Sequence, residues 1–341
     1  MKPKRRWMKM SIKVMRPGLL TTIQDIGRHG YQKDGMIVSG AMDKVALRIA
    51  NLLVGNQENQ PVIEITLMGP KIEFQQDALI ALTGGDLSPT VNDEAVKMWR
   101  PLYVKKGSVL QFGVPILGCR SYLSISGAFN VPAVMGSTST SLRARIGGLH
   151  GKALQSGDEV LSHPPTETGE AIIKKLVKKQ TDRSFQQAFW TIHPKLLPSY
   201  ETPIIRTMKG AEFDWFTKES QQHFFNQEFD VTPQSDRMGY RLKGKKLVLG
   251  QEKELLSSAV TFGTIQVPKE GQPIVLLADH QTTGGYPRIG QVATADFSAL
   301  AQISPGKKVS FQAISLDEAQ HLYMEQEKKI NHIKRALRMK I

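Results

Sequence analysis

The segment Ala78-Leu79-Ile80-Ala81-Leu82-Thr83-Gly84-Gly85 is decisive for the fold, because an apolar run of strand length ends directly in a Thr-Gly-Gly turn. Short apolar runs bounded by glycine are typical of buried β-strands. The arrangement returns in the second half of the chain, where Thr283-Gly284-Gly285 follows the apolar run at 274–278. Similar strand patterns also lie at 106–112 and 305–311, in the same order. These repeats predict a mainly β protein with a few helices, built as two β-barrel domains related by apparent duplication.

One clear helix interrupts the strands of the first half. Strand patterns occur at 62–66 and 121–125, on either side of the apolar run described above. Between residues 39 and 55 the spacing of the apolar residues becomes that of a helix. Ser39 is the predicted N-cap of this helix, and Gly55 is its predicted end. The residues at helical spacing are Met42, Val45, Ala46, Ile49, Leu52 and Leu53.

The pattern of composition predicts five parts of the chain. Residues 163–188 change character, with two prolines, a Thr/Glu patch and lysine pairs, which indicates an interdomain linker. Ser315 with Glu318 forms a capping-box pattern that opens a final helix. The predicted parts are a basic N-terminal extension at 1–10, a first β-barrel at 11–162, the linker at 163–188, a second β-barrel at 189–314 and a basic C-terminal helix at 315–341.

The formal charge of +14 lies mainly outside the predicted barrels. Its contributors are residues 1–10, the lysine-rich stretch at 174–183 and residues 328–341, and the rest of the chain is close to neutral. A nucleic-acid-binding protein would concentrate its positive charge on a folded face, so we expect no nucleic acid partner. Apolar runs are too short to span a bilayer, and the single cysteine, Cys119, is expected to be a small buried core residue. These features predict a cytoplasmic protein without a membrane partner.

The loop at 21–31 is the first candidate site. Its glycines break regular structure, and Asp25, Arg28 and Tyr31 supply charge and hydrogen bonding. An arginine matches the geometry of a carboxylate or phosphate, so this loop is a candidate for binding an anionic substrate. The alternative is an Asp–Arg pair that only stitches a turn.

A second candidate loop lies at 235–241. It contains Asp236, Arg237, Tyr240 and Arg241, with two arginines for one carboxylate. The surplus positive charge favours an anion site over a closed ion pair.

The strongest local signal is the polar segment 279–287, which directly follows an apolar strand. Such loops often carry function. Backbone N–H groups near Gly284 and Gly285, with the hydroxyls of Thr282 and Thr283, are suited to holding an oxyanion or carboxylate. The alternative is a tight turn with satisfied hydroxyls. The preceding His280 is expected to be structural.

Several familiar signatures are missing from the sequence. There is no Walker-type phosphate loop, no Gly-x-Ser-x-Gly nucleophile elbow and no histidine pattern with metal-ligand spacing. We therefore assign no metal ligands and leave a metal requirement unknown. Since no Ala-Met-Lys-Met sequence occurs, we expect no covalent biotin on this chain.

A set of motifs in fixed order resembles the carboxyltransferase subdomain A and B family, which includes the second subunit of allophanate-hydrolase-related proteins. The resemblance covers residues 16–306 and implies a fold of two cyclophilin-like β-barrels. The carrying strings are Gly18-Leu19-Leu20-Thr21-Thr22-Ile23-Gln24-Asp25-Ile26-Gly27-Arg28, Ser39-Gly40-Ala41-Met42-Asp43, Ala50-Asn51-Leu52-Leu53-Val54-Gly55-Asn56, Gly136-Ser137-Thr138-Ser139-Thr140, Ser235-Asp236-Arg237-Met238-Gly239-Tyr240-Arg241-Leu242 and Gln281-Thr282-Thr283-Gly284-Gly285-Tyr286-Pro287.

The resemblance implies three functions. Free-standing members of this length act with two other 5-oxoprolinase subunits, one like a kinase inhibitor and one of the lactam-utilisation type. Together they open 5-oxoproline to L-glutamate with ATP as cosubstrate. A second function is regulatory, the antagonism of a sporulation-kinase inhibitor. The third is the carboxyltransferase component of a biotin-dependent carboxylase of the urea type.

The resemblance also gives the candidate residues a common chemistry. Arg237 or Arg241 would hold an anionic group, with Asp236 and Tyr240 orienting the arginines. The loop of Thr282, Thr283 and Gly284 would stabilise developing negative charge. The remaining predicted substrate-binding residues are Asp25, Arg28, Tyr31, Gln281, Gly285 and Tyr286.

Overall fold

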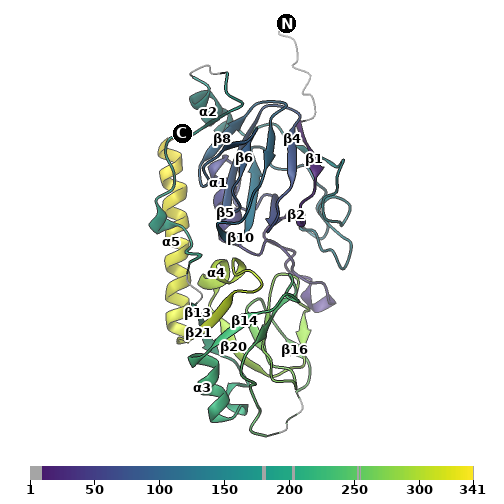
Figure 1. Ribbon diagram of the computed structural model, residues 1–341, viewed down its shortest axis with the longest axis vertical. Helices are drawn as coiled ribbons and strands as arrows, with labels where there is room; N and C mark the ends of the chain where they lie inside the picture. The colour runs from purple at the N-terminus through teal and green to yellow at the C-terminus, as the bar shows by residue number, and fades with distance from the viewer. Residues whose placement is uncertain (1–9, 179–181, 202–203, 252, 254, 341) are drawn as a thin grey trace. The chain divides into compact units, whose positions relative to one another are not determined.

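A computed structural model describes residues 10–178, 182–201, 204–251, 253 and 255–340. The predicted N-terminal extension therefore lies almost wholly outside the described residues. The chain divides into two compact units (Figure 1). Unit 1 comprises Met1–Gly27, Lys44–Leu197 and His332–Ile341, and unit 2 comprises Arg28–Asp43 and Pro198–Asn331. The predicted domain boundaries stay a prediction.

Among its described residues, unit 1 contains two six-stranded sheets. The first sheet has the order β11-β1-β4-β9-β6-β7. Its strands are β1 (Met10–Arg16), β4 (Lys71–Phe74), β6 (Thr90–Val91), β7 (Glu94–Ala95), β9 (Val109–Gln111) and β11 (Glu159–Ser162).

The second sheet of unit 1 has the order β12-β8-β5-β10-β3-β2. Its strands are β2 (Leu20–Gln24), β3 (Val62–Thr66), β5 (Ala78–Asp86), β8 (Pro101–Val104), β10 (Leu117–Ile125) and β12 (Phe185–Gln187). The strand patterns predicted at 62–66, 78–82 and 121–125 are confirmed. Cys119 is buried in β10, also as predicted.

The two faces of this second sheet differ in chemistry. Ile23, Ile63, Leu123 and Leu82 lie opposite one another on adjacent strands and belong to the apolar core of unit 1. Because side chains alternate along a strand, the neighbouring positions face the other way. Those positions carry a buried polar row that crosses the sheet, made of Thr22, Glu64, Tyr122 and Thr83.

Helix α1 (Lys44–Leu53) covers part of this polar face. The hydroxyl of Thr83 donates to the carbonyl of Ala46 at 2.8 Å, and the hydroxyl of Ser124 donates to the side chain of Asn51 at 2.7 Å. The helix exists as predicted, but the predicted N-cap is wrong. Ser39 lies five residues before the helix begins, with a left-handed φ of 56°, and its hydroxyl donates to Asp279 instead.

The predicted linker at 163–188 contains regular structure. Helix α2 (Glu167–Leu176) begins at an N-cap threonine, Thr166, which accepts from the N–H of Gly169 at 3.0 Å. Strand β12 then pairs with β8 and extends the second sheet at its edge. A short 3₁₀ helix, η2 (Pro194–Leu196), follows.

Unit 2 contains a closed seven-stranded barrel with the order β13-β20-β17-β18-β15-β14-β21. An odd number of strands cannot alternate all the way round, and the parallel pair is β13 with β21. The strands are β13 (Ile204–Lys209), β14 (Glu228–Val231), β15 (Gly239–Lys243), β17 (Thr264–Gln266), β18 (Ile274–Leu276), β20 (Arg288–Val292) and β21 (Lys308–Ala313). A separate ribbon joins β16 (Ser258–Ala259) to β19 (Thr283–Gly284). The mainly β fold class is confirmed.

Unit 2 also contains short helices, of which α3 and α4 are labelled in Figure 1. They are η1 (Gln32–Asp34), η3 (Phe213–Trp215), α3 (Lys218–Asn226), η4 (Thr294–Asp296) and α4 (Phe297–Ala301). The predicted final helix is confirmed as α5 (Leu316–Lys340), and its capping box forms as expected. Glu318 accepts from the N–H of Ser315 at 2.7 Å, while the N–H of Glu318 donates to the hydroxyl of Ser315 at 3.2 Å.

We predict that Phe224→Ala destabilises unit 2 by about 4 kcal/mol, because it removes a large side chain from a closely packed core. Phe224 is fully buried in α3 and stacks on Phe311 of β21, with ring centroids 4.8 Å apart. Chemical denaturation measures the loss. Phe189→Ala is the control, since this ring is 93% exposed and its removal should change stability by less than about 0.5 kcal/mol. Equal effects of the two substitutions would contradict the assignment of the core.

Candidate functional site

Asp25 is the predicted site residue that lies in unit 1, and its carboxylate accepts five hydrogen bonds. Its first oxygen accepts from the N–H of Gly27 at 2.8 Å and from the hydroxyls of Ser137 at 2.7 Å and Ser139 at 2.5 Å. Its second oxygen accepts from the N–H of Thr138 at 2.6 Å and from the hydroxyl of that residue at 3.0 Å. Five donors leave little capacity for a ligand, so the geometry favours a structural role in which this carboxylate joins two segments of the chain.

The environment of Asp25 favours its charged form. Burial acts to raise the pKa of this carboxyl, but the hydrogen bonds from Ser139, Ser137 and the backbone outweigh burial and leave the pKa below its ordinary value. A charged carboxylate therefore holds the segment Ser137–Thr140 against the end of β2.

We expect Asp25→Asn to destabilise the protein by about 3 kcal/mol, since an amide can accept at one oxygen only and leaves converging donors unpaired. The pH dependence follows from the lowered folded pKa. The unfolded chain binds the proton first as pH falls, so the stability from Asp25 is present above the ordinary value of 3.8 and is lost on acidification below it.

Denaturation midpoints measured from pH 6 down to pH 3 test this prediction. The wild-type curve should fall more steeply than the curve of Asp25→Asn. The exposed Asp34 supplies a control, because Asp34→Asn should follow the wild type. Parallel curves for the wild type and Asp25→Asn would contradict the role of the charge.

Gln24 is the last residue of β2, directly before Asp25, and is fully buried. Its amide nitrogen donates to the hydroxyl of Thr22 at 3.0 Å and to the carbonyl of Thr140 at 3.1 Å. Its amide oxygen is buried and has no hydrogen-bond partner in the described part of the chain. Buried polar atoms normally have a partner, so this oxygen is a candidate ligand contact.

The polar row beside Gln24 contains a buried acid. Glu64 on β3 is 1% exposed and accepts from the hydroxyl of Tyr122 on β10 at 2.9 Å. A buried carboxylate on the polar face of a sheet is costly for stability alone. This face of unit 1 is therefore a stronger candidate site than the sequence alone indicated.

Lys44 is the first residue of α1 and its side chain is half-buried. Burial lowers the pKa of this lysine, and the negative charge of Asp25 partly offsets the effect. Within the described residues, its ammonium group has no hydrogen bond or ion pair. A cation in the first turn of a helix is also opposed by the helix dipole. These features make Lys44 a candidate for binding an anion.

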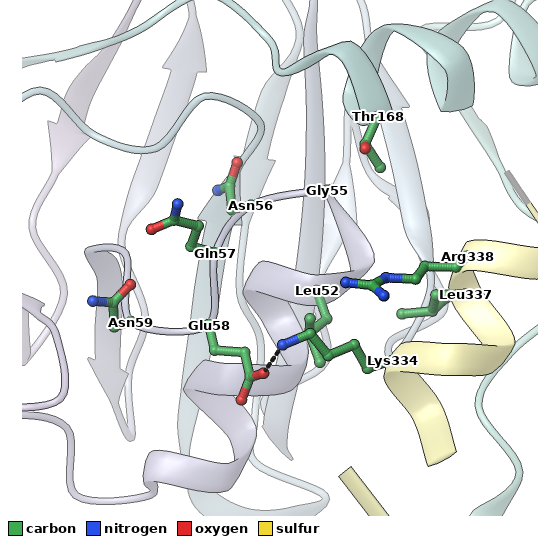
Figure 2. A pocket seen from close by; sticks show the side chains of 10 residues that line it. All are labelled: Leu52, Gly55, Asn56, Gln57, Glu58, Asn59, Thr168, Lys334, Leu337 and Arg338. Carbon is green, nitrogen blue, oxygen red and sulfur yellow. Dashed lines mark hydrogen bonds and ion pairs between the residues drawn. The ribbon is translucent and has the colours of Figure 1, made fainter. Parts of the chain in front are cut away.

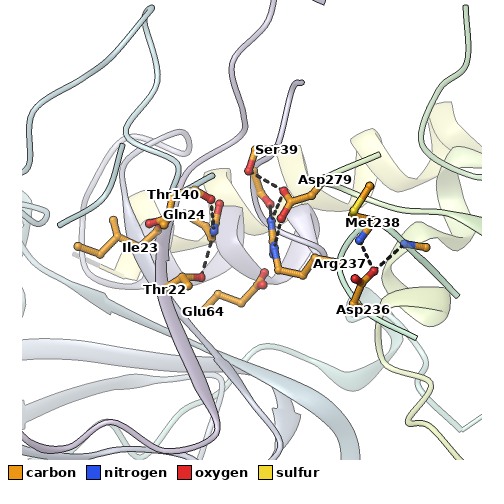
Figure 3. Close-up of polar contacts among 12 residues, drawn as sticks. Thr22, Ile23, Gln24, Ser39, Glu64, Thr140, Asp236, Arg237, Met238 and Asp279 are labelled. Atoms are coloured by element: carbon orange, nitrogen blue, oxygen red, sulfur yellow. Dashed lines mark hydrogen bonds and ion pairs between the residues drawn. The ribbon is translucent and has the colours of Figure 1, made fainter. Parts of the chain in front are cut away.

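Arg237 is the centre of a polar network in unit 2 (Figure 3). Its guanidinium donates to both oxygens of Asp279, at 2.9 and 3.1 Å, and to the carbonyl of Gly40 at 2.6 Å. The hydroxyl of Ser39 donates to Asp279 at 2.7 Å. Arg237 is 5% exposed and the Asp279 side chain is 11% exposed. This bidentate pair joins the segments at 39–40, 237 and 279.

The other residues of the 235–241 loop lie apart from this network. Asp236 accepts from the N–H groups of Met238 and Gly239, at 2.7 and 3.2 Å, which shapes the turn. Tyr240 belongs to the apolar core and its hydroxyl donates to the carbonyl of Ala301 at 3.4 Å. Arg241 is exposed. The carboxylate that orients Arg237 is therefore Asp279, in place of the predicted Asp236 and Tyr240.

We predict that Arg237→Ala destabilises unit 2 by about 3–5 kcal/mol, because Asp279 is left as a buried unpaired charge. The double substitution Arg237→Met with Asp279→Leu should cost less than Arg237→Ala, since no charge then remains. Denaturation of the single and double variants measures the coupling.

A matched control is the exposed pair of Lys308 and Glu228, whose side chains are 60% and 56% exposed. Removing Lys308 should leave the stability nearly unchanged, because solvent screens an exposed ion pair. A double variant at 237 and 279 that is as unstable as the sum of its single variants would contradict the proposed coupling.

The predicted loop after β18 forms the β16–β19 ribbon. Thr283 pairs with Ala259 and Gly284 with Ser258. The carbonyl of Thr282 accepts from the N–H of Val260 at 3.1 Å. Gln281, Thr283, Gly285 and Tyr286 are exposed, while Gly284 is buried.

Gly284 lies close to a second unpartnered amide. A Cβ at this glycine would lie 2.1 Å from the amide nitrogen of Gln266, which is buried and has no hydrogen-bond partner among the described residues. The ribbon therefore has both exposed polar groups and a tight glycine contact, as a binding loop or a tight turn would have.

The two remaining predicted residues lie in the part of unit 2 at 28–43. Arg28 is fully buried, and its backbone N–H donates to the carbonyl of Val38 at 2.7 Å. Tyr31 is half-buried and precedes η1. Of the predicted site residues, Arg237 is paired with Asp279, a partner that the sequence did not predict. Asp25 lies in the other unit, unit 1.

Sequence reasoning missed Gln24, Lys44, Glu64 and Ser39 as site residues. Gln24 lies in one of the family strings and Ser39 opens another, so their places in those strings were the available signal. Glu64 was hidden inside a strand whose other residues are mostly apolar. Lys44 reads in the sequence as an ordinary surface lysine at a helix start.

A cavity of about 500 Å³ with charged residues in its lining lies elsewhere in unit 1, between the end of α1 and the end of α5 (Figure 2). Glu58 pairs with Lys334 at 2.7 Å and with Arg48 at 2.8 Å. Burial raises the pKa of Glu58, but these two partners outweigh it, and the pKa lies below its ordinary value. Arg338 adds a further positive charge to the lining. The basic C-terminal helix thus places part of its charge around a cavity.

Two further kinds of feature are absent from the described part of the chain. No group of three His, Cys, Asp or Glu side chains there is arranged to hold a metal ion. None of the helices in the same residues has the length and apolar character needed to cross a bilayer.

The fold and these polar networks define a mainly β protein with a closed barrel and buried polar clusters. Residues 34–313 match the carboxyltransferase domain, subdomain A and B, family. The chain is 38% identical over 314 residues to the C subunit of 5-oxoprolinase from Haemophilus influenzae, covering 92% of this chain and 94% of that protein. It is 41% identical over 317 residues to the C subunit of 5-oxoprolinase from Escherichia coli, covering 93% and 96% of the two chains. The chain therefore belongs to the carboxyltransferase domain, subdomain A and B, family.

A solved structure agrees with this assignment. The urea carboxylase of Kluyveromyces lactis superposes with a TM-score of 0.84 and 31% identity, over 96% of this chain. This chain spans only 29% of the length of that protein. It spans 20% of the related urea amidolyase of the same yeast.

Proposed function

We propose that this chain is a subunit of an ATP-dependent 5-oxoprolinase complex, which opens 5-oxoproline to L-glutamate and hydrolyses ATP to ADP and phosphate. The observation that carries the proposal is the similarity to two proteins named as the C subunit of 5-oxoprolinase, over at least nine-tenths of both chains. The buried polar face of unit 1 supports it, because a polar cluster with an unpartnered acceptor suits a small polar substrate.

The chemistry explains the need for ATP. The lactam of 5-oxoproline is resonance-stabilised, which makes its carbonyl carbon a poor electrophile. This carbonyl must therefore be activated before water can attack it. Transfer of the γ-phosphoryl group to the lactam oxygen releases ADP and makes the ring carbon electrophilic. Water then adds, the ring nitrogen leaves as an amine and an acyl phosphate remains. A second water releases phosphate and L-glutamate, which balances the reaction.

The sequence lacks a Walker-type loop, so we assign ATP binding to the complex that this chain forms with the two other subunits. The chain alone is expected to be inactive. We propose that the complex works in the cytoplasm, consistent with the single buried cysteine.

A second candidate is the carboxyltransferase component of a biotin-dependent enzyme. The superposition on urea carboxylase, with its TM-score of 0.84, favours it. This function requires a biotinylated partner, whereas 5-oxoprolinase does not. The antagonism of a kinase inhibitor, which the sequence resemblance also implied, has no specific structural observation in its favour.

We expect 5-oxoproline-dependent ADP release only when this chain is mixed with its two partner subunits. The measurement is a coupled ADP assay on the chain alone, on the partners alone and on the purified mixture. Omission of 5-oxoproline is the control for background ATP hydrolysis. A purified complex that shows no 5-oxoproline-dependent turnover, together with a biotinylated protein in a pull-down, would favour the carboxyltransferase instead.

A further inference from the structure

The cavity shown in Figure 2 is formed by residues that all belong to unit 1. Its apolar lining includes Leu52, near the end of α1, and Leu337, near the end of α5, and both side chains are buried. Its polar lining includes the exposed amides of Gln57 and Asn59. Small-molecule sites are typically cavities of this size that combine apolar walls with a few polar groups.

Hydrogen bonds fix the wall of the cavity that follows α1. The amide nitrogen of Asn56 donates to the carbonyl of Ile125, at the end of β10, at 2.7 Å. The hydroxyl of Thr166, the N-cap of α2, donates to the carbonyl of Gly55 at 3.0 Å. The loop after α1 is therefore tied both to the sheet and to α2. A ligand meets a preformed wall, which lowers the entropic cost of binding.

Two contacts hold the end of α5 at the same cavity. The ammonium group of Lys334 donates to the carboxylate of Glu58 at 2.7 Å, and that of Lys175, in α2, donates to the carbonyl of Lys340 at 2.7 Å. Glu58 also pairs with Arg48 at 2.8 Å. The charges of Lys334 and Glu58 are thus already paired within the protein.

Arg338 is the remaining cation of the lining. Its guanidinium extends from α5 toward the end of α1 (Figure 2), and it has no hydrogen bond or ion pair within the described residues. Because Lys334 and Glu58 balance each other, the lining carries one net positive charge. The fork of an arginine matches the two oxygens of a carboxylate, and a single carboxylate neutralises this charge.

We propose that this cavity binds a small aliphatic monocarboxylate. The carboxylate accepts hydrogen bonds from the guanidinium of Arg338, and the aliphatic part packs on Leu52 and Leu337. The site goes beyond the proposed function, since none of its lining residues belongs to the buried polar row of Thr22, Glu64, Tyr122 and Thr83.

The ligand must carry both chemical groups. A carboxylate alone gains little from an exposed arginine, because solvent screens the attraction. An aliphatic chain alone removes methylene groups from water but leaves the positive charge of the cavity unpaired. Both contacts together account for an affinity that neither group would reach on its own.

The test is a calorimetric titration of the full-length chain with three probes. Hexanoate carries the carboxylate and the aliphatic body, acetate carries the carboxylate with a single methyl group, and hexanol carries the body without the charge. The wild type should bind hexanoate at least about tenfold more tightly than either of the other probes. The affinity for hexanoate should fall as salt is added, since salt screens the charge of an exposed arginine.

Substitutions on one helix separate the site from the general charge of α5. Arg338→Met should weaken hexanoate at least about tenfold while leaving hexanol nearly unchanged. Arg338→Lys keeps the charge without the fork and should recover part of the affinity. The matched control is Arg335→Met, because Arg335 is also exposed but does not line the cavity. This variant should bind hexanoate as the wild type does.

Hydrogen exchange supplies a second measurement. A bound carboxylate joins the end of α5 to the end of α1, so hexanoate should slow amide exchange at 332–340 in the wild type and in Arg335→Met. It should have no such effect in Arg338→Met.

Three results would overturn the proposed site. They are equal affinities for hexanoate and hexanol, equal losses in Arg338→Met and Arg335→Met, and no binding of hexanoate by the wild type up to about 10 mM. None of them bears on 5-oxoproline-dependent ADP release by the complex, which is measured separately and decides the proposed function.

Discussion

The hydrogen bonds to Asp25 are the constraint on which the polar region of unit 1 depends. One charged carboxylate gathers two backbone N–H groups and three hydroxyls, and so fixes a loop at 137–139 to the end of a strand far away in sequence. With that loop in place, the carbonyl of Thr140 can orient the amide of Gln24. The alternation along β2 and β3 then directs Thr22 and Glu64 to the same polar face. The charged carboxylate of Asp25 thus fixes the loop, and the loop in turn orients the amide of Gln24, whose oxygen has no hydrogen-bond partner in the described residues.

In unit 2 an ion pair, rather than a single carboxylate, holds distant segments together. Arg237 and Asp279 form a bidentate pair whose remaining capacity is used by Gly40 and Ser39. A pair that is satisfied on all sides holds three segments together but offers little to a substrate. The two units therefore differ in what their charged residues do. In unit 1 the cation of Arg338 is unused within the described residues, and in unit 2 the arginine is committed to the protein itself.

Much of the fold follows from local patterns, and much of the site does not. The apolar runs, the helix before Gly55 and the capping box at Ser315 are readable because their physics is local: alternation, helical period and a hydrogen bond three residues away. Motif strings also placed Asp25 and Arg237 among polar clusters. The partner of Arg237, however, lies 42 residues away at Asp279, and proximity in sequence pointed to Asp236 instead. Ser39 failed as an N-cap for the same reason, since its hydroxyl is used by a distant carboxylate. Lys44 could not be found because its isolation is a property of the packed structure.

The parallel pair that closes the barrel of unit 2 has a consequence for how the protein is made. Ile204 in the first barrel strand pairs with Ser310 in the last, so the ring has no closed form until the ribosome has released nearly the whole chain. Until then both closing edges are open strands, which can pair with other chains. Long-range pairing of this kind also slows folding. Nascent chains that end before β21 are therefore the forms in which this protein most needs protection from aggregation.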